Sequence, residues 1–287
     1  MNRCVVTGSS GFVGGRIKAR LQREGWQVDG WSRRGDPNGT RFSLGQSVAP
    51  ATLNDVRALV HCAYDFAPAS REEIVSVNVA GSLKLFEAAR AAGVERIVFI
   101  SSLSAFPGCR SEYGRAKLQI EEQAQRLGIW VIRPGLVYGE RPGGLFGGLV
   151  GQVRRSRVMP VLWGGRQWQY LIHEEDLGSL VLRMINGSGP ARPEPVSAAH
   201  ERGWKLGDIL RAIERALGKR VVHVPVPWQI AWLGLKACEA MGVPTPFRSD
   251  SLISLIYQNP KPDFGCLKSF GFECRPFAVR PEMLQER

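Results

Sequence analysis

The sequence predicts an α/β protein with a doubly wound parallel sheet, followed by a small C-terminal α/β lobe. Short apolar runs alternate with helical patterns through the first half of the 287 residues. Glycines stand just past the expected helices, at Gly25, Gly93 and Gly128, where helix C-termini favour them. A glycine-rich turn also links the first apolar run to the first helix. Together these features are typical of a sheet whose strands are joined by crossover helices.

The expected strands of the main domain are short and bounded by turn residues. They are Arg3–Thr7, Gln27–Trp31, Ala58–His61, Arg96–Ser101 and Trp130–Arg133. The helices expected between them are Val13–Arg23, Glu72–Ala92 and Glu112–Arg126. The regular alternation predicts that all five strands run parallel in one sheet.

Glycine and proline become frequent through Gly135–Gly151, and the alternating pattern weakens beyond that point. Further helices are expected at Glu174–Ile185, Leu206–Leu217 and Pro227–Met241. We therefore expect a dinucleotide-binding domain over residues 1–185. A smaller substrate-binding lobe is expected over 186–287, with contributions from about 140–172.

Charge and composition limit the possible functions. The formal net charge is +12, but the basic residues are scattered, so a phosphorylated small molecule is favoured over nucleic acid as the partner. No apolar run is long enough to cross a membrane, and the chain starts with strand-like residues rather than a signal peptide, which predicts a cytoplasmic protein. The six cysteines form no CxxC pair, so no metal site is expected.

The turn Thr7-Gly8-Ser9-Ser10-Gly11-Phe12-Val13-Gly14 carries glycines at intervals of three. Gly8 permits a sharp turn, Gly11 permits close approach of backbone to a pyrophosphate, and Gly14 permits close helix packing. Because this turn joins a strand to a helix, it predicts dinucleotide binding in a Rossmann-type domain. The residues expected to contact the cofactor are Gly8, Ser10, Gly11, Phe12, Val13 and Gly14.

The end of the second expected strand indicates which dinucleotide binds. Ser32, Arg33 and Arg34 stand there, and arginine side chains match a ribose 2′-phosphate, so NADP(H) is favoured. Asp29 is the alternative: if the strand register is shifted by three residues, its carboxylate takes the ribose hydroxyls and the cofactor is NAD.

Tyr113 and Lys117 lie four residues apart and share one face of an expected helix. A nearby ammonium is expected to lower the phenol pKa, so that the tyrosine exchanges a proton with an alcohol or ketone oxygen during hydride transfer. An apolar strand ending in Ser101 and Ser102 precedes this helix. Ser102 is expected to donate a hydrogen bond to the substrate oxygen, whereas a strand end or helix cap is the alternative for either serine.

These motifs together resemble the extended branch of the short-chain dehydrogenase/reductase superfamily, which contains nucleotide-sugar epimerases, dehydratases and reductases. The resemblance covers about the first 180 residues. It rests on TGSSGFVG, His61-Cys62-Ala63, the Asn78 segment NVAGS, Ser101-Ser102, YGRAK, Arg133–Gly139 and Ile172–Leu177. It implies a catalytic triad of Ser102, Tyr113 and Lys117. It also implies that Lys117 holds the nicotinamide ribose, that Asn78 fixes the active-site helix and strand, and that the cofactor is lined by Cys62, Ala63, Ser101, Pro134 and Val137.

The sequence also departs from that pattern. Leu103-Ser104 stand where the dehydratases carry an Asp-Glu pair, which disfavours sugar 4,6-dehydration. The spacing from Ser102 to Tyr113 is short for this branch. Gln169 replaces an arginine that often meets the nucleotide diphosphate, and nearby Arg166 is a possible substitute.

We therefore expect an NADP(H)-dependent oxidoreductase acting on a carbonyl or alcohol of a nucleotide sugar or related small molecule. An epimerase with tightly bound NAD(P) is the alternative, and a non-catalytic NADP-binding regulator is a lesser one. The resemblance suggests a homodimer. The segment Trp228–Trp232 is open to three interpretations: packing against the substrate lobe, contact with a second subunit or contact with a membrane surface.

Overall fold

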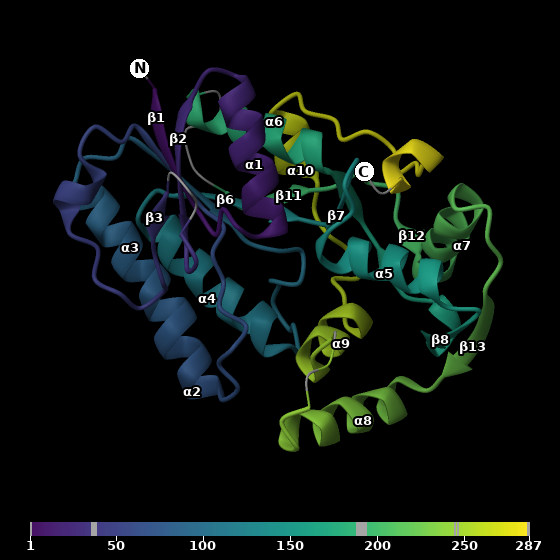
Figure 1. Ribbon diagram of the computed structural model, residues 1–287. Coiled ribbons are helices and arrows are strands. Elements are labelled where there is room, and N and C mark those ends of the chain that lie inside the picture. Colours follow the sequence, from purple (N-terminus) through teal and green to yellow (C-terminus); the bar gives the residue numbers. More distant parts are fainter. Residues whose placement is uncertain (1, 36–38, 188–193, 244, 246, 286–287) are drawn as a thin grey trace.

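A seven-stranded parallel sheet forms the centre of the protein (Figure 1). The computed structural model describes residues 2–35, 39–187, 194–243, 245 and 247–285. The strand order is β11-β6-β5-β4-β1-β2-β3, and every neighbouring pair is parallel. The strands are β1 (Arg3–Thr7), β2 (Gln27–Ser32), β3 (Thr40–Arg41), β4 (Ala58–His61), β5 (Arg96–Ile100), β6 (Trp130–Pro134) and β11 (Val196–Ala198). The predicted fold class is confirmed.

Helices cover both faces of this sheet. On one face α1 (Phe12–Arg23) and α6 (Glu174–Ile185) pack on apolar side chains such as Val6 and Val98. On the other face α3 (Ala80–Ala91) and α4 (Glu112–Arg126) pack on Val5, Leu59 and Phe99. These strand residues alternate between the two clusters because successive side chains of a strand point to opposite faces.

The helix expected over Glu72–Ala92 is continuous but not uniform. It begins as α2 (Arg71–Ile74), widens into a π-helical segment at Val75–Val79 and continues as α3. Asn78 lies in the widened turn and is fully buried. Such π segments are common at functional sites, because they re-aim side chains along a helix.

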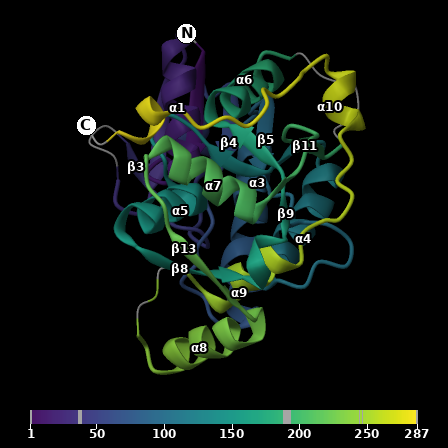
Figure 2. The same ribbon diagram turned by 90° about the vertical axis from the view of Figure 1, so that its right-hand side faces the viewer.

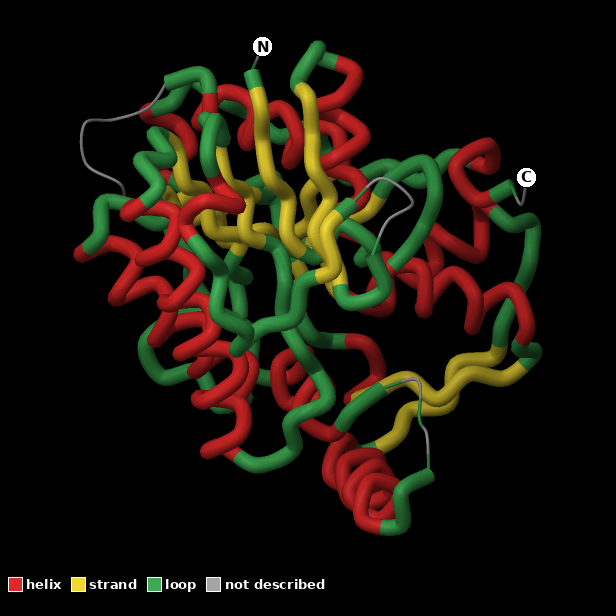
Figure 3. The backbone as a smooth tube through the Cα atoms, turned by 60° about the vertical axis from the view of Figure 1, so that its left-hand side comes forward, coloured by secondary structure: helices red, strands yellow, loops and turns green. Residues whose placement is uncertain are grey.

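A second lobe lies beyond the carboxyl ends of the strands (Figures 2 and 3). Its core joins Phe146 and Leu149 to Ile209 and Leu210. Its helices are α5 (Gly144–Arg155), α7 (Leu206–Ala216), α8 (Trp228–Ala240) and α9 (Ser249–Ile256). Its strands form three pairs: β7 (Leu136–Tyr138) with β10 (Leu171–His173), β8 (Val158–Leu162) with β13 (Val222–Val226), and β9 (Trp168–Gln169) with β12 (Trp204–Lys205). Strand β11 and α10 (Gly265–Ser269), both after residue 185, contribute to the main sheet and its apolar cluster.

Helix α8, which contains Trp228 and Trp232, packs beside α9 and has no buried residue. Ile230 and Leu233 on its outer face are 63% and 61% exposed. On its other face, Trp232 and Lys236 line a cavity between this lobe and the main sheet. In the described part of the chain, no helix has both the length and the apolar character needed to span a membrane.

Candidate active site

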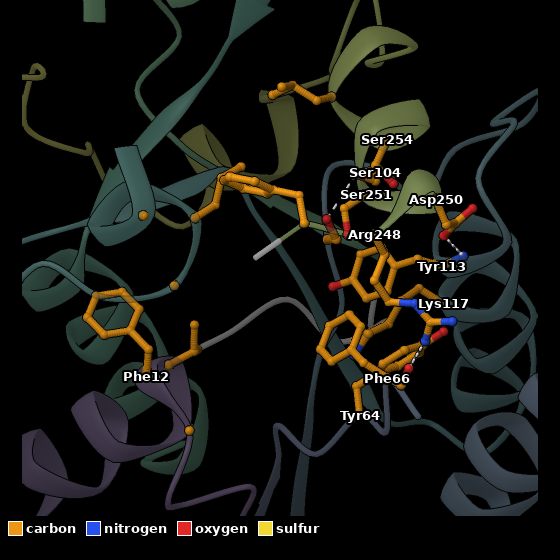
Figure 4. Close-up of a pocket in the computed structure, with 18 of the residues that line it drawn as sticks. Phe12, Tyr64, Phe66, Ser104, Tyr113, Lys117, Arg248, Asp250, Ser251 and Ser254 are labelled. Atoms are coloured by element: carbon orange, nitrogen blue, oxygen red, sulfur yellow. Dashed lines mark hydrogen bonds between the residues drawn. The ribbon is translucent and has the colours of Figure 1, made fainter. Parts of the chain in front are cut away.

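A cavity of about 1490 Å³ lies between the carboxyl ends of the main-sheet strands and the second lobe (Figure 4). It is lined by sixteen of the residues that the sequence singles out: Gly8, Ser10, Gly11, Phe12, Val13, Gly14, Ser32, Arg33, Cys62, Ala63, Ser101, Ser102, Tyr113, Lys117, Pro134 and Val137. Arg34 and Asn78 do not line it. The topology brings these distant segments together because the ends of parallel strands meet at one sheet edge.

The glycine turn brings the start of α1 into close contact with neighbouring backbone. Gly8 has a φ of +69°, and a Cβ placed there would lie 2.9 Å from the Ala63 nitrogen. A Cβ at Gly14 would lie 2.3 Å from the Gly8 oxygen. Helix α1 starts after Gly11 with no side-chain cap and no acidic residue in its first turn. Its positive end is therefore suited to an anion such as a pyrophosphate.

The end of β2 carries polar groups suited to a ribose. Ser32 is buried, and its hydroxyl has no hydrogen-bond partner among the described residues. A buried hydroxyl without a partner is costly, so this one fits a ribose hydroxyl or 2′-phosphate. Both Arg33 and Arg34 are exposed, but only Arg33 lines the cavity, where it forms an ion pair with Asp65 at 2.8 Å.

Asp29, the alternative ribose ligand, has a different partner. It lies opposite Val5 in the sheet, three residues before the end of β2. Its carboxylate accepts hydrogen bonds from Arg3 Nε and Nη2 at 2.9 and 2.6 Å. The register shift that would bring Asp29 to the cofactor is therefore absent.

Lys117 is buried beneath the floor of the cavity. Its ammonium donates a hydrogen bond to the Ile100 carbonyl at 2.9 Å and lies 4.6 Å from the centre of the Phe99 ring. Burial lowers the pKa of Lys117 to about 8. The shared helix face predicted for Tyr113 and Lys117 is present, with the ammonium 5.9 Å from the centre of the tyrosine ring.

The expected lowering of the Tyr113 pKa is wrong for this structure. Burial raises the pKa of Tyr113 to about 12, although a hydrogen bond with Ser102 opposes the rise. Desolvation of the phenolate outweighs this hydrogen bond, and the negative charge of Glu121 adds to the rise. Tyr113 is therefore a neutral phenol near pH 7, in contact with the predicted hydroxyl partner.

Two aromatic side chains that sequence reasoning missed enclose Tyr113 (Figure 4). The Tyr64 ring meets it edge-on at 4.9 Å, and the Phe66 ring stacks on it at 5.8 Å between centres. Asn78 holds the loop that carries both rings: it accepts from the Asp65 N–H at 2.7 Å and donates to the Asp65 carbonyl at 3.0 Å. The sequence contains a signal for them, because Tyr64 and Phe66 come three and five residues after the strand that ends at His61.

A buried carboxylate lies on the face of α4 that packs against the sheet. Glu121 is 1% exposed and accepts hydrogen bonds from Arg133 Nε at 2.9 and 3.0 Å, and from the Ser101 hydroxyl. It thereby joins α4 to β6 and to the residue that follows β5. Its position four residues after Lys117 placed it on the same helix face, which is the signal that sequence reasoning overlooked.

The second lobe contributes charged groups that the motifs did not reveal. Besides Arg33 and Lys117, four basic side chains line the cavity: Arg155, Lys236 and Arg248 of the second lobe, and Arg110 of the loop before α4, which faces that lobe. Arg110 lies over the Tyr257 ring at 4.2 Å. Gln169 lines the cavity but Arg166 does not, so Arg166 does not take the place of the arginine expected there. The carboxylate of Asp250 binds the start of α4 (Figure 4).

The sheet, the phosphate turn and the Ser-Tyr-Lys arrangement define an enzyme of the extended short-chain dehydrogenase/reductase type. The sequence model of the "NAD dependent epimerase/dehydratase family" matches residues 4–196. The chain belongs to this family, and the resemblance noted in the sequence is confirmed.

Individual relatives are distant. An uncharacterized protein, y4nG, of Sinorhizobium fredii is 28% identical over 64% of this chain and 54% of its own length. A ceramide reductase of Caulobacter vibrioides is 28% identical over 77% of this chain and 73% of its own. The structure of a UDP-glucose 4-epimerase from Thermotoga maritima, with UDP-glucose, superposes with a TM-score of 0.70 at 18% identity, over 99% of this chain and 96% of that one. The chain thus spans about half the length of the first relative, and the last comparison shows a shared fold.

Proposed function

We propose that the protein is an NADP(H)-dependent oxidoreductase that reduces a carbonyl group, or oxidises the corresponding alcohol, of a nucleotide sugar or related small molecule. The observation that carries this proposal is the grouping of Ser102, Tyr113 and Lys117 in one cavity with the glycine turn. The same cavity therefore holds proton-transfer groups and a site suited to a dinucleotide.

The protonation states favour reduction as the direction of catalysis. A reductase needs a protonated acid beside the carbonyl oxygen, and a Tyr113 pKa of about 12 keeps the phenol neutral. Ser102 and Tyr113 donate hydrogen bonds to the carbonyl oxygen, and Tyr113 passes its proton to the developing alkoxide. Lys117 supplies positive charge below the phenol. Bound NADPH supplies the hydride.

The cofactor proposal rests on the end of β2. The unpartnered Ser32 hydroxyl and the Arg33 guanidinium lie where the adenosine ribose belongs. The carboxylate of Asp29, which would favour NAD, forms an ion pair with Arg3 instead. These contacts support NADP(H), provided that a 2′-phosphate displaces Asp65 from Arg33.

The substrate proposal rests on the charge of the second-lobe side of the cavity. Lys236 there pairs with Glu239, and Asp250 accepts from the start of α4, which leaves Arg110, Arg155 and Arg248 to suit a substrate with an anionic group. The Thermotoga structure contains UDP-glucose, so nucleotide sugars are the first substrates to test. The ceramide reductase relative adds long-chain ketones to the panel.

The same residues also suit epimerisation, and family membership favours this as the second candidate. An epimerase returns the hydride to the opposite face of the same substrate, so it consumes no cofactor. Its cofactor would remain bound through gel filtration, and UDP-glucose would change configuration without net NADPH oxidation.

The decisive experiment measures NADPH oxidation with a panel of keto-sugar nucleotides and ketones. Tyr113→Phe and Ser102→Ala should each remove turnover while NADPH affinity stays within about twofold. Tyr138→Phe is the matched control, because the Tyr138 hydroxyl bonds the Pro276 carbonyl outside the cavity. Full turnover by Tyr113→Phe would end the proposal.

A further inference from the structure

A second cavity, of about 880 Å³, lies on the second lobe and is lined by residues of β9, β12 and α7. It shares no lining residue with the active-site cavity. Strand β9 separates the two: Trp168 lines the second cavity and is 54% exposed, whereas its neighbour Gln169 is buried and lines the first. Successive residues of a strand face opposite sides, so the two cavities open on different faces.

The lining of this cavity is strongly basic. Six of its eleven residues are Arg or Lys: Arg202, Lys205, Arg211, Arg215, Lys219 and Arg220. The two acidic members already have partners, since Asp208 binds Arg211 at 2.6 Å and Glu214 binds His223. Within the described part of the chain, no carboxylate pairs with Arg202, Lys205, Arg215 or Arg220. The cavity therefore concentrates positive charge that the fold does not neutralise.

Two tryptophans give the cavity flat aromatic surfaces. Lys205 lies over the Trp168 ring at 5.6 Å, and Arg202 lies over the Trp204 ring at 5.3 Å. A cation at an indole face is a favourable arrangement, and it leaves the guanidinium and ammonium donors free to meet an anion. Exposed indole beside unpaired guanidinium groups is the combination that binds a base and its phosphates.

We propose that this cavity is a second ligand site that takes a nucleoside phosphate. The base stacks on Trp168, and the phosphates bind the guanidinium groups of Arg202, Arg215 and Arg220. A cavity of this volume accommodates one small ligand, and the basic residues gather in one place instead of following an extended groove. Both features favour a mononucleotide over a nucleic-acid strand.

The test is calorimetric titration with ADP, which also fits the adenosine end of the cofactor site. Wild-type protein should show two classes of site. The double variant Trp168→Ala/Arg215→Ala should lose one class, with affinity falling at least tenfold, while its NADPH affinity stays unchanged. Trp163→Ala/Arg126→Ala is the matched control, because Trp163 is 56% exposed, Arg126 is exposed, and neither lines either of these two cavities.

Arg215→Glu/Arg220→Glu provides a second variant that keeps both tryptophans and reverses the charge. It should lose the same class of ADP site. A single class of site in wild-type protein, or ADP binding that both double variants retain, would overturn the proposal. Inorganic phosphate that competes fully with ADP, together with no effect of Trp168→Ala alone, would overturn the stacking role. If a single-stranded oligonucleotide binds wild-type protein far more tightly than ADP, and the same variants abolish that binding, the ligand of this cavity is a nucleic-acid strand and not a mononucleotide.

Discussion

Asp250 in the second lobe accepts a hydrogen bond from the backbone N–H of Tyr113 at 3.0 Å. Its other carboxylate oxygen accepts from the N–H of Glu112 at 2.8 Å. These N–H groups belong to the first turn of α4, where the helix itself offers no acceptor. Two residues earlier, Arg248 donates to the carbonyl of Phe66, whose ring stacks on Tyr113. The start of α9 therefore holds Tyr113, the proposed proton donor, by its backbone and by its aromatic neighbour.

Asp250→Ala should lower kcat by roughly 10- to 100-fold, because small misplacements of a catalytic group carry costs of this size. NADPH affinity should stay unchanged, since Asp250 holds only the start of α4. Asp250→Asn keeps one acceptor oxygen, so its kcat should lie between those of Asp250→Ala and wild type. Asp263→Ala is the control, because Asp263 accepts from the Gly265 N–H at the start of α10, outside the cavity. Equal kcat for Asp250→Ala and wild type would refute this role.

Arg33→Ala should raise the KM for NADPH by roughly 10- to 100-fold, the range expected when one hydrogen bond to a charged group is lost. The KM for NADH should change little, because NADH lacks the 2′-phosphate. Arg34→Ala is the matched control: this neighbouring arginine is exposed and outside the cavity, so both KM values should stay near wild type. Initial rates with both cofactors provide the measurement. A wild-type enzyme that uses NADH as well as NADPH would contradict the assignment.

The pH dependence of kcat/KM should follow Lys117. The pKa of this lysine is lowered to about 8 by burial, so its ammonium is present below pH 8 and lost as the pH rises through that value. Reduction should therefore be constant between pH 6 and 7.5 and decline above pH 8. Tyr113, with a pKa of about 12, does not titrate in this interval. A profile that stays flat to pH 10 would show that the charge on Lys117 is not required.

The lowered pKa of Lys117 also affects the stability of the cofactor-free protein. Between pH 8 and 10.5 the unfolded chain binds a proton that the folded state does not, so this group adds stability as the pH rises through that window. Lys117→Met removes the cost of a buried charge at pH 7. The variant should therefore be more stable than wild type at pH 7, and the difference should shrink toward pH 10.5 in urea titrations.

The sequence predicted the sheet and the cofactor turn well, because these depend on local patterns. The five predicted strands, the glycine spacing of Gly8 and Gly14 and the i, i+4 pair on α4 all have signals within a few residues. The last hundred residues carry weaker patterns. There the helices α7 and α8 were predicted from apolar periodicity, but the placement of β11 in the main sheet was not.

The missed site residues act over long distances in the sequence. Asp250 meets Tyr113 across 137 positions, and no periodicity links an acidic residue in one lobe to a helix start in another. The Tyr113 pKa was mispredicted because the helix pattern shows the neighbouring lysine but not how deeply the phenol is buried. Pairwise spacing gives the sign of a charge interaction, whereas desolvation depends on the whole fold.

Glu121 and Arg133 should couple strongly in stability. Glu121→Gln leaves the Arg133 guanidinium beside a neutral amide in a buried site, and breaking such a pair costs about 3–5 kcal/mol. Glu122→Gln is the matched control, since Glu122 is the next residue and exposed. The free energies of unfolding come from urea titration, provided that the slopes with denaturant agree.

The double variant Glu121→Leu/Arg133→Met distinguishes the cost of leaving one buried charge unpaired from the cost of lost packing. Removing both charges together leaves no uncompensated ion, so the double variant should recover most of the stability lost by Glu121→Gln. If Glu121→Gln matches the control, the carboxylate is not a structural link between α4 and β6. If the double variant is as unstable as the single one, the loss arises from packing or from the Ser101 hydroxyl, which also binds Glu121.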